Sequence, residues 1–128
     1  MDFGLQNIQD YSKDLLWMLK TLKQIEKEFY NEKWTFRKPI NSESAFNDVV
    51  IQLKPKLKEL ILQRDDGYYK QLLYKIDISK SQIAKAVAIE KDVDFVEVLT
   101  KLIIRRCLQK VLIRNYYKGM KKNFLRRA

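Results

Sequence analysis

One stretch of the chain, residues 93–118, contains no glycine or proline and is apolar on almost every side of its first half. The apolar side chains of that half are Phe95, Val96, Val98, Leu99, Leu102, Ile103 and Ile104. A helix with apolar residues all round must be buried by other elements of the fold. We therefore expect a long helix from Val93 to about Lys118, capped by Asp92, with Leu102 and Ile103 at the centre of a helical bundle.

The rest of the chain has the spacing of further helices. Apolar residues recur every three or four positions, which is the period of an amphipathic helix. Only 3 glycines and 2 prolines occur in 128 residues, and an all-β fold of this length would need more turn residues. We expect helices over residues 5–32, 46–60, 68–76 and 79–89.

Local signals mark where these helices begin and end. The candidate N-caps of the second helix are Asn41, Ser42 and Ser44. Its apolar rhythm continues through Pro55, which predicts one kinked helix or two abutting helices. Ser79 and Gln82 have the spacing of a capping box. Residues 34–40 read as an extended connector, because Pro39 disfavours helical backbone at the preceding residue.

These patterns predict a single all-α domain. We expect a compact bundle of four to six helices with a long C-terminal helix that is first buried and then basic. Residues 1–118 are assigned to the helical domain and residues 119–128 to a basic C-terminal extension, with Gly119 ending or loosening the last helix. The chain has one cysteine, no basic-then-apolar leader and no uncharged apolar run long enough to span a membrane. A cytoplasmic protein is the expectation.

The net charge of +10 is concentrated at one end of the chain. Residues 1–97 hold 16 acidic and 16 basic residues and are neutral as a whole. Residues 98–128 hold 10 basic residues and no acidic one. Such an asymmetry is typical of a chain that meets an anionic partner.

Six of the C-terminal bases recur at every fourth position. They are Arg106, Lys110, Arg114, Lys118, Lys122 and Arg126, with Lys121 beside them. Residues at this spacing form one ridge along a helix. We expect the ridge to point away from the arc that docks on the body and to bind the phosphate backbone of RNA or DNA. The alternatives are an acidic protein surface, an anionic membrane, or a solvated face that only aids solubility.

The main rival function is a protein–protein adaptor or assembly subunit. In that interpretation the apolar residues near the end of the chain, Tyr116, Tyr117, Met120 and Phe124, dock on another chain. Enzyme signatures are missing: the chain has no histidine and no glycine-rich phosphate loop, which excludes histidine-dependent catalysis and nucleotide fingerprints. We expect no cofactor, no metal site and no catalytic residue. Cys107 is expected to be a buried structural thiol. The sequence does not define an oligomeric state.

Overall fold

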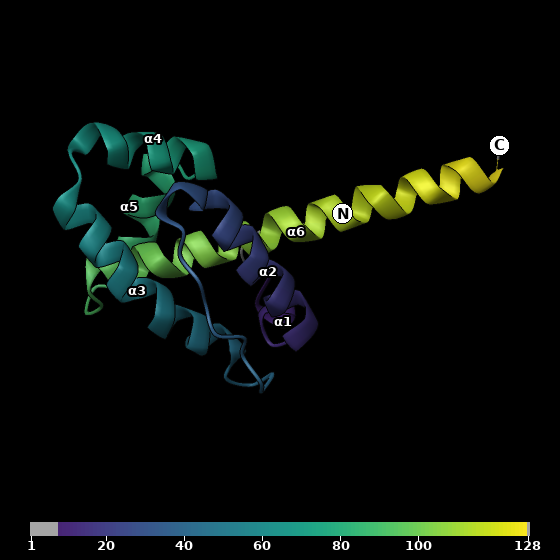
Figure 1. Ribbon diagram of the computed structural model, residues 1–128, viewed down its shortest axis with the longest axis horizontal. Coiled ribbons are helices and arrows are strands. Elements are labelled where there is room, and N and C mark those ends of the chain that lie inside the picture. The colour runs from purple at the N-terminus through teal and green to yellow at the C-terminus, as the bar shows by residue number, and fades with distance from the viewer. Residues whose placement is uncertain (1–7, 128) are drawn as a thin grey trace.

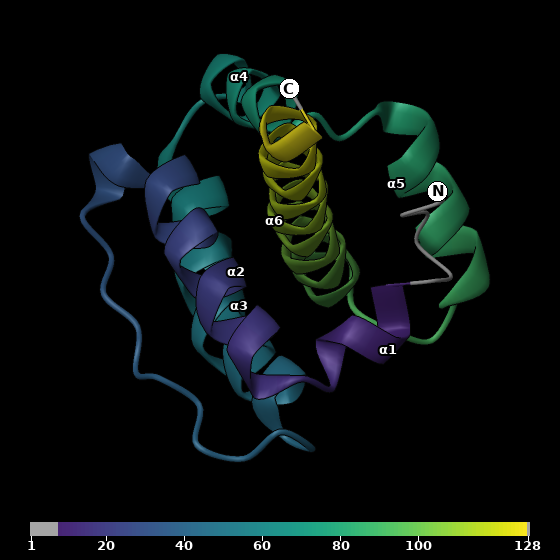
Figure 2. The same cartoon turned by 90° about the vertical axis from the view of Figure 1, so that its right-hand side faces the viewer.

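The computed structural model describes residues 8–127, with side chains placed as far as Lys122, and shows an all-α fold. Its elements are α1 (Ile8–Ser12), α2 (Leu15–Glu28), a 3-10 turn (Tyr30–Glu32), α3 (Ala45–Gln63), α4 (Asp66–Ile76), α5 (Lys80–Ile89) and α6 (Phe95–Arg127). Figure 2 looks along α6 and shows α1 to α5 arranged around it. The predicted fold class, a helical bundle with a long last helix, is confirmed.

The first half of α6 is the centre of the core, as its all-round apolar pattern predicted. Leu99, Ile103 and Ile104 are fully buried, and Leu102 is 5% exposed. Among the other helices, α2 and α3 make the most extensive contacts with α6, and α5 packs mainly against α6. Because one helix touches nearly every other element, its orientation decides where the C-terminal bases lie relative to the body.

The first predicted helix is wrong in its extent. Residues 5–7 lie outside the described part of the chain, and the remainder is divided into α1, α2 and the 3-10 turn. The division occurs at Asp14, whose backbone is extended and whose carboxylate accepts a hydrogen bond from the amide of Trp17 at 3.2 Å. An aspartate in this position satisfies the free amides of a new helix start, and this competes with continuation of the preceding helix.

The second predicted helix runs unbroken through its proline. Pro55 is exposed on the outer side of α3, and Leu53 and Leu57 on either side of it are fully buried. Ser44 does precede the helix, but its side chain makes no capping bond to the backbone; its hydroxyl lies 3.2 Å from Asp48 instead. Ser44 is thus the N-cap residue, as one of the three candidates, but it lacks the side-chain hydrogen bond that this role usually provides.

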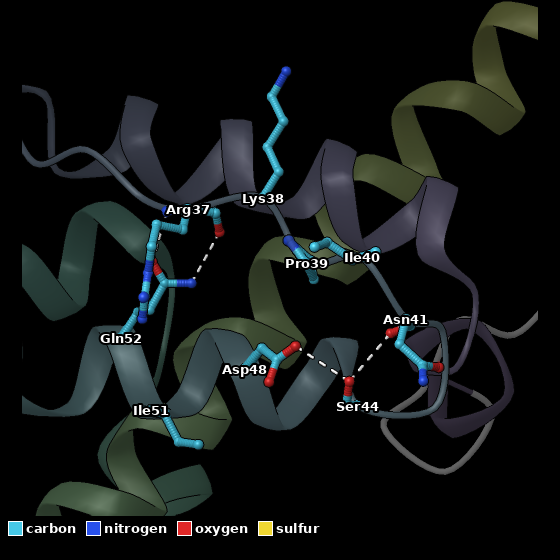
Figure 3. Close-up of a pocket in the computed structure, with 9 residues that line it drawn as sticks. All are labelled: Arg37, Lys38, Pro39, Ile40, Asn41, Ser44, Asp48, Ile51 and Gln52. Carbon is cyan, nitrogen blue, oxygen red and sulfur yellow. Dashed lines mark hydrogen bonds between the residues drawn. The ribbon is translucent and has the colours of Figure 1, made fainter.

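The connector before α3 is extended, as predicted, and α3 holds it in place. The side-chain amide of Gln52 accepts a hydrogen bond from the backbone N–H of Arg37 at 2.7 Å and donates one to the carbonyl of Arg37 at 2.9 Å (Figure 3). This pairing satisfies backbone groups that a strand would satisfy with a neighbouring strand. The connector and α3 line a shallow cavity of about 400 Å³, in which Ile40 and Ile51 are exposed.

The turn between α4 and α5 has the predicted capping box. The Ser79 hydroxyl accepts from the amide of Gln82, and the Gln82 side chain accepts from the amide of Ser79. Asp77 ends α4 in the left-handed region, with φ of 69°. This turn places Asp77 where α6 passes.

α6 is longer than predicted at its C-terminal end. It begins at Phe95, two residues after the expected start, and continues through Gly119 to Arg127. Gly119 is therefore helical and does not end the helix. Figure 1 shows the last part of α6 projecting from the body. None of the helices in the described part of the chain combines the length and the apolar content needed to cross a membrane.

Candidate anion-binding surface

The first two bases of the predicted ridge contact the body of the protein. Arg106 donates to the carboxylate of Asp77 at 2.7 Å, and Lys110 donates to the carboxylate of Glu28 at 2.6 Å. Glu28 is 7% exposed, so the second pair is largely buried between α2 and α6. These two bases are compensated by acids that lie far away in the sequence.

The third base, Arg114, belongs to the same network. Its guanidinium donates to the side-chain oxygen of Gln24 at 2.6 Å. The nitrogen of Gln24 donates to the Glu28 carboxylate at 3.0 Å. Lys75 of α4 completes the network by donating to the backbone carbonyl of Glu28. Arg114 is thus held beside α2 and its remaining donors are left for another acceptor.

The expectation that the whole ridge points away from the body is wrong, and the geometry of the helix gives the reason. Arg114 follows the buried residues Val111 and Cys107 by three and seven positions, so it shares their side of α6. The first half of the ridge therefore lies along the margin of the docking surface. Long basic side chains at that margin reach acceptors on α2 and α4.

Arg114 and Lys118, the next bases of the ridge, line a groove between α2 and α6. Its volume is about 330 Å³, and it is lined by Lys20, Lys23, Gln24, Lys27, Val111, Arg114, Asn115 and Lys118. We call it the basic groove. Three lysines form its α2 wall, one arginine and one lysine form its α6 wall, and no acidic residue is among the described residues that line it. It is a concave site with positive charge on both sides.

The three α2 lysines are not among the residues predicted for the site. Lys20, Lys23 and Lys27 are spaced by three and four residues, so they lie on one face of α2, and all three are exposed. That spacing is visible in the sequence, but by itself it indicates only a helix face exposed to solvent. Only the antiparallel placement of α2 beside α6, seen in the pairs Glu28–Lys110 and Gln24–Arg114, brings them opposite the C-terminal bases.

The projecting end of α6, residues 116–122, carries the rest of the predicted site. Lys118, Lys121 and Lys122 are exposed, as are the docking candidates Tyr116, Tyr117 and Met120. Tyr117 is 64% exposed and its ring meets that of Tyr116 edge to face. The side chains of Phe124 and Arg126, both named in the predicted site, lie outside those that the structure describes.

Cys107 is fully buried in the core, as predicted. The pKa of its thiol is raised from 9.0 to about 12; burial is the largest cause, the charge of Glu28 adds to it, and Lys110 and Arg106 oppose it. The folded protein therefore keeps this proton at pH values where an unfolded chain releases it.

The raised thiol pKa predicts a loss of stability in alkali. Because the unfolded chain ionises first, the free energy of unfolding should fall as the pH rises from about 9 toward 12. Between pH 8 and pH 10.5 this group should remove about 2 kcal/mol, at about 1.4 kcal/mol per pKa unit. Chemical denaturation at both pH values checks this, with Cys107→Ala as the control that lacks the contribution. Equal losses in the two proteins would show that the thiol is not the cause.

Comparisons of the chain with protein-family models, with curated protein sequences and with solved structures give no match.

Proposed function

We propose that this protein is a non-enzymatic helical binding module that contacts the phosphate backbone of RNA or DNA. The binding surface consists of the basic groove together with Lys121 and Lys122 on the projecting end of α6. The bundle supplies a rigid platform, and α2 and the projecting α6 supply the charges. Phosphate contacts of this kind give affinity without reading the base sequence.

The observation that carries the proposal is the convergence of five uncompensated bases on one concave site. Three other bases of α6 do have acidic partners: Lys101 pairs with Glu90 and Glu97, Arg106 pairs with Asp77, and Lys110 pairs with Glu28. Among the described residues, no carboxylate forms an ion pair with a base of the basic groove. Like charges held this close repel one another, and a bound polyanion removes that repulsion.

Charge reversal in the groove tests the proposal. The triple variant Lys23→Glu, Lys27→Glu and Lys118→Glu should lower affinity for duplex DNA or RNA at least a hundredfold at about 50 mM salt, where phosphate contacts are strong. For the unaltered protein, log K should fall with log salt with a slope of about −4 to −5 on duplex DNA, corresponding to about five neutralised phosphates. Fluorescence anisotropy of a labelled oligonucleotide measures both quantities.

A matched control separates the site from the net charge. Lys58, Lys70 and Lys85 are exposed residues of α3, α4 and α5 that do not line the groove. Reversing these three changes the net charge by the same amount and should lower affinity much less. Equal losses in the two triple variants, or no binding by the unaltered protein at about 50 mM salt, would contradict the proposal.

Exposed apolar residues support a second candidate, a protein–protein adaptor with an acidic partner. Tyr117 and Met120 are exposed on α6 beside the lysines, and Ile40 is 90% exposed at the connector cavity. A surface that combines apolar anchors with a basic rim suits an acidic protein. Capture from a native lysate with and without nuclease distinguishes the two functions, because a protein partner that binds directly is retained after the nucleic acid is digested.

A further inference from the structure

We infer that the basic groove takes single-stranded nucleic acid in preference to a duplex. The inference rests on the proposed function and specifies which form of the polyanion the groove fits. Three features of the site lead to it: the shape of the groove, the chemistry of its floor, and two aromatic residues that neighbour the lysines at one end.

The shape of the groove favours a narrow chain. Packed helices lie about 8–10 Å apart, so a groove between two of them is a slot with a wall on each side. Lysines stand on the α2 wall, and Arg114 and Lys118 stand on the α6 wall. One flexible strand can lie along this slot with its phosphates facing both walls. A duplex presents a convex surface, which rests on the rims of the groove. The basic side chains deeper in the groove then have no phosphate to contact.

The floor of the groove carries groups that suit unpaired bases. Asn115 and Gln24 contribute side-chain amides and Val111 contributes an apolar surface. Gln24 is already bonded to Arg114 and to Glu28, so Asn115 supplies the adaptable donor and acceptor pair. Base edges can reach such a floor when they are not engaged in base pairing, as in a single strand.

Arg114 is pre-positioned on the α6 wall. The hydrogen bond to Gln24 holds one nitrogen of its guanidinium, and the Gln24 side chain is fixed in turn by the buried pair of Glu28 with Lys110. The guanidinium has five N–H donors, so it can bond a ligand while it keeps the bond to Gln24. A phosphate in the slot therefore meets an arginine that loses little conformational freedom on binding.

Two aromatic residues lie close in sequence to the lysines at one end of the basic groove. The antiparallel pairs between α2 and α6 place Lys20 near the level of Lys118. Trp17 lies one turn before Lys20, whose ammonium is 4.9 Å from the Trp17 ring centre, and Tyr117 lies beside Lys118. Proteins that bind single strands combine a basic groove with aromatic rings on which bases stack. A duplex keeps its bases stacked within itself and cannot use these rings.

A direct comparison of the affinities for the single strand and the duplex tests the inference. One labelled oligonucleotide of mixed sequence is titrated with the full-length protein, first alone and then annealed to its complement, in the same buffer at about 100 mM salt. We expect the single strand to bind at least tenfold more tightly, with a salt slope of about −3.5 for five phosphates, since the slope per phosphate is smaller for single strands. A duplex affinity equal to or above the single-strand affinity overturns the inference and leaves the proposed function standing. If neither form binds, the proposed function itself fails.

A matched pair of variants at Tyr117 tests the stacking contribution. Tyr117→Ala should lower single-strand affinity about tenfold and leave duplex affinity and the salt slope unchanged, whereas Tyr117→Phe should retain the single-strand affinity. Because Tyr117 is exposed, neither variant should disturb the fold. A ratio of single-strand to duplex affinity that Tyr117→Ala leaves unchanged overturns the stacking argument.

Discussion

Replacing Ile103 by alanine should lower the free energy of unfolding by about 2–5 kcal/mol, because the substitution removes buried methyl groups and leaves a cavity. Ile103 is fully buried in the half of α6 that the other helices surround. Few neighbours can move to fill the space, since they belong to several different helices. Urea denaturation followed by circular dichroism measures the change.

Ile89 provides the control for this substitution. It is an isoleucine of the same size at the end of α5, and it is 82% exposed. Ile89→Ala should change stability by no more than about 0.5 kcal/mol. If Ile103→Ala also lowered the free energy of unfolding by no more than about 0.5 kcal/mol, the first half of α6 would not be the core.

The second large effect is expected at the buried ion pair between α2 and α6. Glu28→Leu leaves the Lys110 ammonium without its acid in a site where the lysine side chain is only 20% exposed. Removing one partner of a buried pair destabilises a protein by about 3–5 kcal/mol, and the remaining exposure of Lys110 places the expected loss near the lower value. Denaturant titration of the variant gives the loss directly.

A double variant distinguishes the ion pair from simple packing. In Glu28→Leu with Lys110→Met, both charges are replaced by apolar side chains, and the double variant should be more stable than Glu28→Leu alone. If the second substitution instead adds its own full loss, the two residues do not interact and the α2–α6 contact is placed incorrectly.

The same double variant should also change the geometry of the basic groove. Without the Glu28 carboxylate, Gln24 loses a hydrogen-bond partner, so Arg114 loses part of the support that holds it at the groove. Affinity for a polyanion should fall modestly while the fold persists. The pair thus contributes to both stability and site geometry.

Much of the fold could be predicted from the sequence because local signals and long-range packing agree. The all-round apolar pattern around Ile103 required a buried central helix, and the Ser79–Gln82 box marked the start of α5. The division at Asp14 was missed because apolar spacing continues across it. The local signal at that point is the Asp14 carboxylate, which accepts a hydrogen bond from the amide of Trp17 and caps the start of α2.

The candidate site was less accessible to prediction, for a physical reason. Periodicity gives the side of a helix on which a residue lies, and it does not give the rotation of that helix against its neighbours. Lys110 and Arg114 were correctly placed on one ridge, yet the ridge runs beside α2, where Glu28 and Gln24 meet it. The lysines of the opposite wall became part of the site only through that contact.

The continuity of α6 has a consequence for the motions of the chain. We expect backbone amides around Ile103 to be released to solvent only when the whole domain opens, whereas those of residues 119–122, in the projecting part of α6, should need only a local fraying of the helix. One unbroken helix thus contains both the slowest and the fastest exchanging helical amides expected in the protein. Like charges along the projecting end favour fraying, and added salt or a bound polyanion screens them. We therefore expect the order of the projecting end to depend on salt and on any bound polyanion, while the core end is ordered by the fold.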